Sequence, residues 1–291
     1  MKINLQLLFF VSISTFAQVN GIVKDSLSGQ PIPYVNISVE NENIGSTSEE
    51  NGEFKLPNLA KDKTLIFSAL GFETKKVKAS LASEVILNPI DYQLDEVTVI
   101  RSFGTKQREI GKSESAILQA FDNGPRIDTK FFPYQTAYKK TKYIQKAVIK
   151  TDNVLEKATF KIHFYSVDEK GFPSEELIRK AFFITVKKGT TTTTLDLTKY
   201  QLKMPKNGIF VGVEKLIIDS NKLEKVVTNA NSKTTEIKTT YYPLVLYNRV
   251  NRDFFYTFSG GKWNRMDKQQ NLDSSGRMMI YEPAIHLILT N

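Results

Sequence analysis

Residues 21–73 contain four diagnostic segments, G-I-V-K-D (21–25), G-Q-P-I-P-Y-V-N-I (29–37), I-G-S-T-S-E-E-N-G-E-F (44–54) and L-I-F-S-A-L-G-F-E (65–73). Short apolar runs alternate with Gly, Pro, Asn and Asp, which is typical of antiparallel strands joined by tight turns. Val35, Ile37 and Val39 fall on one face of a strand, and the polar residues between them fall on the other. Asn51-Gly52 predicts a hairpin turn, because both residues tolerate a positive φ. The stretch therefore predicts a small β-sandwich.

These four segments closely resemble the carboxypeptidase regulatory-like domain of Bacteroidetes envelope proteins. The resemblance implies a seven-stranded, transthyretin-like sandwich over residues 18–90. In that family the domain is often fused to the N-terminus of outer-membrane receptors and other exported proteins. The resemblance implies no catalysis by this part of the chain, because the domain carries no catalytic residues of its own.

The composition sets limits on the rest of the molecule. The chain has 291 residues, 41% of them apolar, and no cysteine. This length fits two ordinary domains, and the apolar content is sufficient for real cores. The lack of cysteine excludes disulfides, thiolate metal sites, cysteine nucleophiles and a lipidated N-terminal cysteine. We therefore expect sheet packing alone to stabilise the fold.

The first seventeen residues, Met1 to Ala17, have the features of a secretory signal peptide. Lys2 supplies the positive start, an apolar run follows, and small residues precede Gln18. The run is too short to span a bilayer, and no later segment is long or apolar enough for a transmembrane helix. We therefore expect an exported protein, in the periplasm or at the outer membrane, that begins at Gln18 after cleavage.

Charge divides the chain into two unequal parts. Residues 18–90 carry 7 lysines and 9 acidic residues, a net charge of −2, whereas residues 91–291 carry 32 Lys and Arg against 22 Asp and Glu, a net charge of +10. Such an asymmetry suggests that the two parts meet different partners.

Residues 91–115 are predicted to be a linker, because their composition is polar and mixed and glycines interrupt them. Within them, L-D-E-V-T-V (94–99) resembles the stretch that follows this domain in TonB-dependent receptors. The alternative interpretation is a last strand or a plain linker, since short β-prone segments are common.

Residues 116–291 are predicted to form a second antiparallel β-sandwich, jelly-roll-like, because many strands occur without alternating helices. Phe160, Ile162 and Phe164 alternate with polar residues, and a Ser N-cap pattern at 173–178 predicts a turn of helix. The order of F-K-I-H-F-Y-S-V-D-E-K-G-F-P (160–173), L-D-L-T-K-Y (195–200) and G-I-F-V-G-V-E (208–214) is similar to an uncharacterised sandwich of exported flavobacterial proteins.

Residues that could support catalysis are sparse. A zinc carboxypeptidase needs two histidines and a carboxylate, with one pair at H-x-x-E spacing, but the two histidines, His163 and His286, lack that spacing. We interpret both as half-exposed strand residues. G-x-S-x-G and phosphate-binding glycine loops do not occur. The chain is therefore predicted to be no enzyme and to use no cofactor or metal.

Glu214 lies in the most apolar predicted strand, between Val213 and Lys215. It could be a buried acid that serves catalysis or sugar binding. The favoured interpretation is a partly exposed or ion-paired strand residue, because buried acids are uncommon unless they are paired.

The candidate binding residues are aromatic and basic: Arg252, Tyr256, Lys262, Trp263 and Arg265. Aromatic rings beside cations can stack on sugars or hold anionic polymers. The alternative is a core aromatic row fringed by solvated charges.

These observations predict an exported, non-enzymatic envelope protein that binds an envelope polysaccharide or another envelope protein. No recognised motif favours nucleic acid as a partner. The main alternative is an outer-membrane or TonB-linked receptor component whose second part is a small barrel, and a further alternative is an enzyme of unknown type.

Overall fold

The computed structural model describes residues 18–57, 59, 61–90, 104–112, 118–228, 234–267 and 279–291. The predicted signal peptide and residues 91–103 and 113–115 of the predicted linker lie outside these ranges. The described chain is built almost wholly from strands, with four short 3-10 helices, and the all-β prediction is confirmed. Within the described part, no helix is long and apolar enough to cross a membrane.

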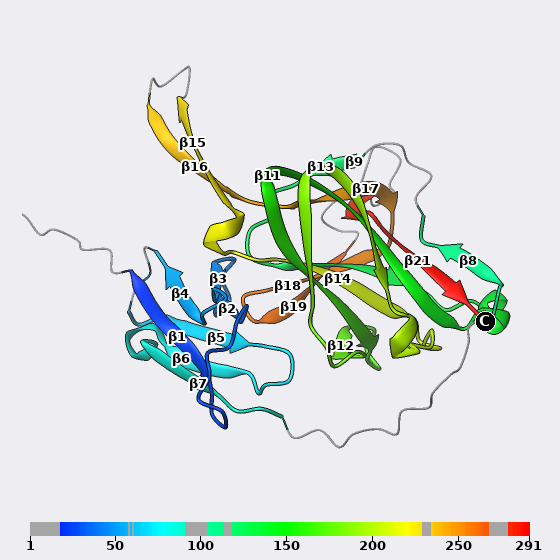
Figure 1. Cartoon of the computed structure of the whole chain (residues 1–291), viewed down its shortest axis with the longest axis horizontal. Helices are drawn as coiled ribbons and strands as arrows, with labels where there is room; N and C mark the ends of the chain where they lie inside the picture. Colours follow the sequence, from blue (N-terminus) through cyan, green and yellow to red (C-terminus); the bar gives the residue numbers. More distant parts are fainter. Residues whose placement is uncertain are drawn as a thin grey trace, which may run out of the picture.

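The first domain, blue and cyan in Figure 1, is a sandwich of two small sheets. One sheet has the order β4-β1-β7 and the other β3-β2-β5-β6. All pairs are antiparallel except β1 with β7. The strands are β1 (Val19–Asp25), β2 (Asn36–Val39), β3 (Gly45–Thr47), β4 (Glu53–Leu56), β5 (Thr64–Ser68), β6 (Lys75–Lys78) and β7 (Glu84–Leu87), with η1 (Ala79–Leu81) before β7.

The residues that decided the prediction take the expected positions. Val35, Ile37 and Val39 are buried in the core between the two sheets. Gly52 has a φ of +79° in the turn before β4, and a Cβ there would lie 2.7 Å from Pro31 Cβ. Only glycine therefore fits this turn without strain.

The second domain is organised around one 12-stranded sheet that folds over on itself. Its strands are β8 (Gln107–Ile110), β9 (Leu118–Ala120), β10 (Ile127–Phe132), β11 (Tyr143–Val167), β12 (Pro173–Glu176), β13 (Phe182–Asp196), β14 (Ile209–Lys215), β17 (Leu244–Asn251), β18 (Phe254–Ser259), β19 (Lys262–Asp267), β20 (Met279–Pro283) and β21 (Ile285–Thr290). The 3-10 helices η2 (Thr136–Lys140), η3 (Thr198–Tyr200) and η4 (Asp219–Asn221) lie between strands.

Strand β11 is 25 residues long and joins the two layers of this domain. Its first half pairs with β13 and β21, and its second half pairs with β13 and β14. The pairing with β13 shifts register between Asn153 and Lys157, where the ribbon bends. Phe160, Ile162 and Phe164 point into the core between the layers, as their alternation predicted.

Two predictions for this domain differ from the structure. Residues 107–110 form β8 and pair with β21, so they belong to the second domain and not to the linker predicted at 91–115. Residues 173–176, predicted as part of a helical turn, form strand β12, because Tyr165 of β11 pairs with Glu176 and extends the sheet. The local N-cap pattern is overridden by this pairing.

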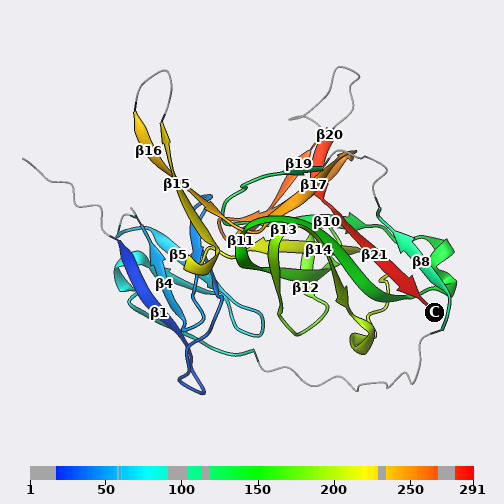
Figure 2. The same ribbon diagram turned by 45° about the horizontal axis from the view of Figure 1, so that its top comes forward.

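Two further strands, β15 (Lys222–Thr228) and β16 (Thr235–Tyr241), form a separate two-stranded ribbon. Figures 1 and 2 show this ribbon, in yellow, projecting away from both domains. We call it the arm.

Hydrogen bonds join the two domains along one side of the first sandwich. The Ile217 amide donates to Thr47 Oγ1 (3.0 Å) and the Asp219 amide donates to Glu49 Oε1 (2.7 Å). At the tip of the β18–β19 hairpin, Lys262 Nζ donates to Asn41 Oδ1 (2.8 Å). Together these hydrogen bonds hold β2 of the first domain against the face of the β11–β14 layer that points away from the second domain's core.

Candidate functional site

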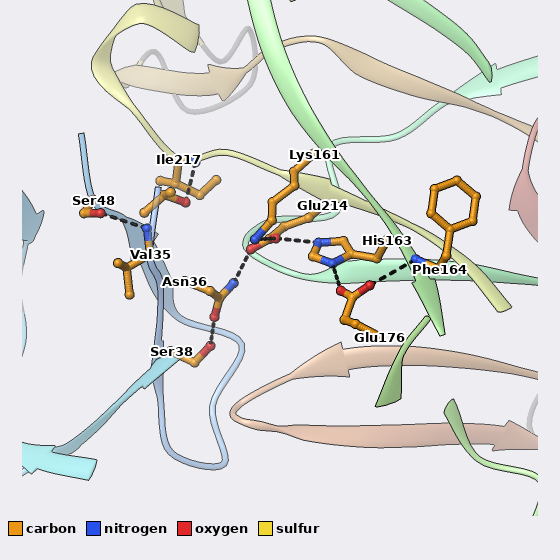
Figure 3. A network of polar contacts seen from close by, with 11 residues as sticks. Val35, Asn36, Ser38, Ser48, Lys161, His163, Phe164, Glu176, Glu214 and Ile217 are labelled. Carbon is orange, nitrogen blue, oxygen red and sulfur yellow. Dashed lines mark hydrogen bonds and ion pairs between the residues drawn. The ribbon is translucent and has the colours of Figure 1, made fainter. Parts of the chain in front are cut away.

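A network of charged side chains lies buried where the two domains meet (Figure 3). Lys161, His163 and Tyr165 alternate with core residues on β11, so they occupy the outer face of that layer. Glu214 of β14 is directly opposite Lys161 and therefore shares this face. An outer face is normally solvated, but here the first domain covers it, and Glu214 is only 1% exposed.

Every oxygen of Glu214 has a partner. His163 Nε2 lies 2.8 Å from Glu214 Oε2, and Lys161 Nζ lies 3.4 Å from the same atom. Asn36 Nδ2 of the first domain donates to Glu214 Oε1 at 2.7 Å. The Ser38 hydroxyl donates to Asn36 Oδ1 (2.9 Å), which orients the amide. A buried carboxylate thus links the two domains.

His163 bridges two carboxylates. Its Nε2 faces Glu214, and its Nδ1 is hydrogen-bonded to Glu176 of β12. Glu176 also accepts a hydrogen bond from the Phe164 amide (3.2 Å). Two carboxylates on opposite ring nitrogens require both nitrogens to donate, which only the imidazolium can do.

The pKa values of the network follow from this arrangement. Burial alone would lower the pKa of His163, but the negative charge of Glu176 and the hydrogen bonds to Glu176 and Glu214 outweigh it, so the pKa is raised. Burial would raise the pKa of Glu214, yet the charge of Lys161 and the hydrogen bond and charge of His163 lower it to about 2. Glu214 is therefore ionised at neutral pH, and His163 holds its proton more tightly than a free imidazole does.

A glycine makes room for the side chains that pack beside the histidine. Gly212 of β14 lies directly opposite His163, and a Cβ there would lie 2.9 Å from Ile127 Cγ2 and 3.3 Å from the Tyr165 ring. The space is used by a stacked pair, since the His163 and Tyr165 rings are parallel within 7° at 5.4 Å. Gly212, which interrupts the apolar run of β14, is thus required by packing around the network.

The network forms the floor of a cleft of about 650 Å³ between the two domains. Leu70, Gly71 and Phe72 of the first domain line one wall. Trp263 and Phe258 of the β18–β19 hairpin line the other, and the Trp263 ring meets Tyr165 edge to face at 5.1 Å. Further polar lining residues come from β12 and the segment after it: Ser174, Glu175 and Arg179.

The structure does not bring the five predicted binding residues into one site. Trp263 lines the interdomain cleft, whereas Arg252 and Tyr256 line a separate pocket of about 190 Å³. Tyr256 is buried against Phe210 and Ile127, as the alternative interpretation of a core aromatic row expected.

The three basic members of that set each have a protein contact. Arg252 forms two hydrogen bonds to Glu282, at 2.9 and 3.2 Å. The Arg265 guanidinium stacks 4.8 Å from the centroid of the Phe254 ring. Lys262 contacts the first domain, as described above.

The sequence interpretation of His163 as a half-exposed residue is wrong, because its side chain is buried beneath the first domain. For Glu214, the ion-paired alternative is the one that the structure bears out, although the residue is buried rather than partly exposed. One sequence signal could have indicated that His163 and Glu214 meet. Lys161 and His163 alternate with core residues on one strand, and Glu214 interrupts the apolar run of another strand.

Comparison with known proteins bears on the first domain. Residues 19–99 match the family of CarboxypepD_reg-like domains. The first domain is a CarboxypepD_reg-like domain. The predicted resemblance is thus confirmed, and the buried Asn36 and Ser38 are contributed to the network by this domain.

A curated protein is similar to part of this chain. TonB-dependent receptor P3 of Formosa agariphila is 30% identical to this chain over 104 residues, which are 35% of this chain and 10% of the receptor. The chain therefore spans about a tenth of the length of the receptor that it matches.

Two solved structures align more loosely. The cysteine protease and lectin-like domains of Cwp84, a surface layer associated protein of Clostridium difficile, align with 89% of this chain and 58% of that chain, at 10% identity and a TM-score of 0.37. BcpA, the major pilin subunit of Bacillus cereus, aligns with 91% of this chain and 84% of that chain, at 10% identity and a TM-score of 0.18. Alignments this loose do not assign the second domain to a fold family.

Proposed function

We propose that this chain is an exported, non-enzymatic recognition protein of the cell envelope that binds a saccharide in the cleft between its two domains. The CarboxypepD_reg-like domain and the partial match to a TonB-dependent receptor support an envelope location. The leader-like residues 1–17 support export.

The observation that carries the proposal is the position of Trp263 in the cleft wall. A sugar ring presents an apolar face of C–H groups that stacks on an indole, and a rim of hydroxyls that requires hydrogen-bonding partners. Trp263 and Phe258 supply aromatic surface, and Ser174, Glu175 and Arg179 bring polar side chains to the same cleft. The mixture of apolar walls and a few polar groups is typical of small-ligand sites.

Recognition is favoured over catalysis by the state of the two carboxylates in the floor. The pKa of Glu214 is lowered to about 2, so it holds no proton to donate at neutral pH. Its oxygens contact His163, Lys161 and Asn36, and Glu176 is bound by His163 and by the Phe164 amide. Groups held in this way stabilise the domain contact and are poorly placed to exchange protons with a substrate.

The chain carries a built-in probe of the cleft, because Trp263 is its only tryptophan. We would titrate the purified protein with a panel of neutral and acidic oligosaccharides and follow tryptophan emission. A saturable change with one class is expected. Isothermal titration calorimetry then gives the affinity of Trp263→Ala, which should fall by roughly 2- to 10-fold, since one aromatic stacking contact contributes ~0.5–1.5 kcal/mol.

Matched variants locate the site. Arg179→Ala should also weaken binding, whereas Arg265→Ala should leave it unchanged, because Arg265 stacks on Phe254 and is not part of the cleft lining. Circular dichroism controls for folding. If no saccharide changes the emission or the heat, or if Arg265→Ala weakens binding while Trp263→Ala does not, the cleft is not a saccharide site.

A further inference from the structure

The arm formed by β15 and β16 exposes apolar residues that the other described residues leave uncovered. Val226 is 70% exposed and Ile237 is 67% exposed, and the two are directly opposite each other across the ribbon. They therefore share one face and form a two-residue apolar patch at the middle of the arm. Figure 2 shows that no other strand lies against this part of the molecule.

An isolated two-stranded ribbon is at best marginally stable in water, and three or more strands with an apolar face are usually needed. The outer edges of the ribbon also carry backbone N–H and C=O groups that can pair with another strand. Among the described residues, β15 and β16 pair only with each other. The arm thus has the properties of an element that is completed by a partner.

The sequence of β16 indicates which partner fits. Residues 235–239 read T-E-I-K-T, with Glu236 and Lys238 placed symmetrically about Ile237. If β16 pairs antiparallel with β16 of a second copy, centred on Ile237, each Glu236 lies opposite the partner's Lys238 and the two Ile237 side chains meet. The strand is therefore complementary to itself in both charge and apolar contact.

We propose that the arm joins two copies of this chain through their β16 edges, forming one four-stranded antiparallel sheet. Directly opposite residues point to the same face, so a single apolar row would run Val226, Ile237, the partner's Ile237 and the partner's Val226. This interface does not depend on any ligand in the interdomain cleft.

The pairing also resolves an unfavourable feature within the arm. Lys225 lies directly opposite Lys238 on the charged face of the ribbon, and like charges in this position are destabilising. In the proposed sheet the partner's Glu236 lies on the other side of Lys238. A negative charge is thus placed next to the lysine pair, twice per dimer because of the two-fold symmetry.

The symmetry makes the assembly closed. The same strand is used by both copies, so the interface is isologous and stops at a dimer. Seven-residue arms bury less than the roughly 1,600 Å² of a standard interface. We therefore expect a monomer–dimer equilibrium that depends on protein concentration.

Sedimentation velocity of the purified protein over a concentration series tests the proposal. The wild-type chain should shift from monomer to dimer as its concentration rises. Glu236→Lys and Lys238→Glu each turn two attractive pairs into two repulsive ones, so each should raise the dimer dissociation constant by more than about ten-fold. Ile237→Asp should abolish the dimer.

The double variant is the decisive test of the proposal. Glu236→Lys combined with Lys238→Glu exchanges the two charges and keeps their complementarity, so it should restore the dimer. Leu27→Lys is the matched control, because Leu27 is an 83% exposed apolar residue on the first domain. A monomer at every concentration, a dimer that survives the single variants, or a double variant that stays monomeric would each overturn the proposal.

Discussion

Two regions of this molecule depart from the usual pattern of burial in opposite directions. At the domain contact, the ionisable side chains of Lys161, His163 and Glu214 are buried. On the arm, the apolar side chains of Val226 and Ile237 are exposed. All five lie on β-strands, so strand structure alone does not determine which residues water can reach.

The difference lies in what covers each face. The outer face of the β11–β14 layer is covered by the first domain, which supplies Asn36 to complete the charged network. The arm has no such cover among the described residues. Whether a sheet face is buried therefore depends on what packs against it. The predictions below test the covered network first and the uncovered arm last.

The largest effect is expected from Glu214→Ala. This change leaves the buried Lys161 and His163 without their shared carboxylate, and an uncompensated buried charge typically costs about 3–5 kcal/mol. Urea unfolding should show that the free energy of unfolding of Glu214→Ala is about 3–5 kcal/mol lower than that of the wild type.

Glu53→Ala is the matched control, since it removes a glutamate from an exposed position of β4 and should change the free energy of unfolding by less than about 0.5 kcal/mol. Equal losses in the free energy of unfolding for the two variants would mean that the buried network stabilises the fold no more than an exposed charge does.

A smaller loss is expected from Asn36→Ala. The change removes the single amide that the first domain donates to Glu214 Oε1, and hydrogen bonds to charged groups contribute roughly 1.5–3 kcal/mol. Lys262→Ala removes an exposed hydrogen bond across the same contact and should cost less than about 0.5 kcal/mol. Hydrogen exchange should show faster opening of β2 in Asn36→Ala only. If β2 exchanges at the wild-type rate, the amide does not hold the domains together.

Local patterns were sufficient to predict the first domain. The spacing of Val35, Ile37 and Val39 and the Asn51-Gly52 turn depend on neighbours in sequence, and the structure places them as expected. The same pattern placed Asn36 on the opposite, polar face of the strand. It is buried because another domain covers that face, and no local signal encodes that cover.

The candidate site was harder to predict for the same reason. His163 and Glu214 meet because β11 and β14 pair in one particular register, and that register depends on contacts between residues distant in sequence. Ser174 illustrates the converse, since its local helix signal loses to pairing of β12 with β11. Tyr256 and Trp263 have similar sequence surroundings, yet one lies in the core and the other lines the cleft.

The pH dependence of stability distinguishes the buried network from ordinary surface charge. The pKa of His163 is raised in the folded state above 6.5, so the folded protein keeps a proton that the unfolded chain releases. The resulting stability is fully present below pH 6.5 and is lost as pH rises through the folded-state pKa. One proton limits the slope to about 1.4 kcal/mol per pH unit.

Urea midpoints measured from about pH 6 to about pH 9 check this decline. Groups facing His163 are Glu176, Glu214 and Lys161, and Glu214 stays ionised across this range because its pKa is lowered to about 2. His163→Gln should flatten the profile. The pKa of His286 is lowered by burial, so His286 is almost wholly neutral in both states above about pH 7.5, and His286→Gln should leave the decline above that pH unchanged. A flat wild-type profile would show that His163 is not held protonated.

The smallest effect is expected on the arm. Ile237→Thr keeps a β-branched side chain suited to a strand and removes apolar surface that is already in water, so the monomer should lose less than about 0.5 kcal/mol. Thermal unfolding of a dilute sample, followed by circular dichroism, measures this. In a concentrated sample the wild-type melting temperature should rise by mass action if the arm pairs with a second copy, and the variant should not follow it. A dilute variant that has lost more than about 1 kcal/mol would instead mean that Ile237 already packs against its own chain, and the contrast between a covered face and an uncovered one would fail.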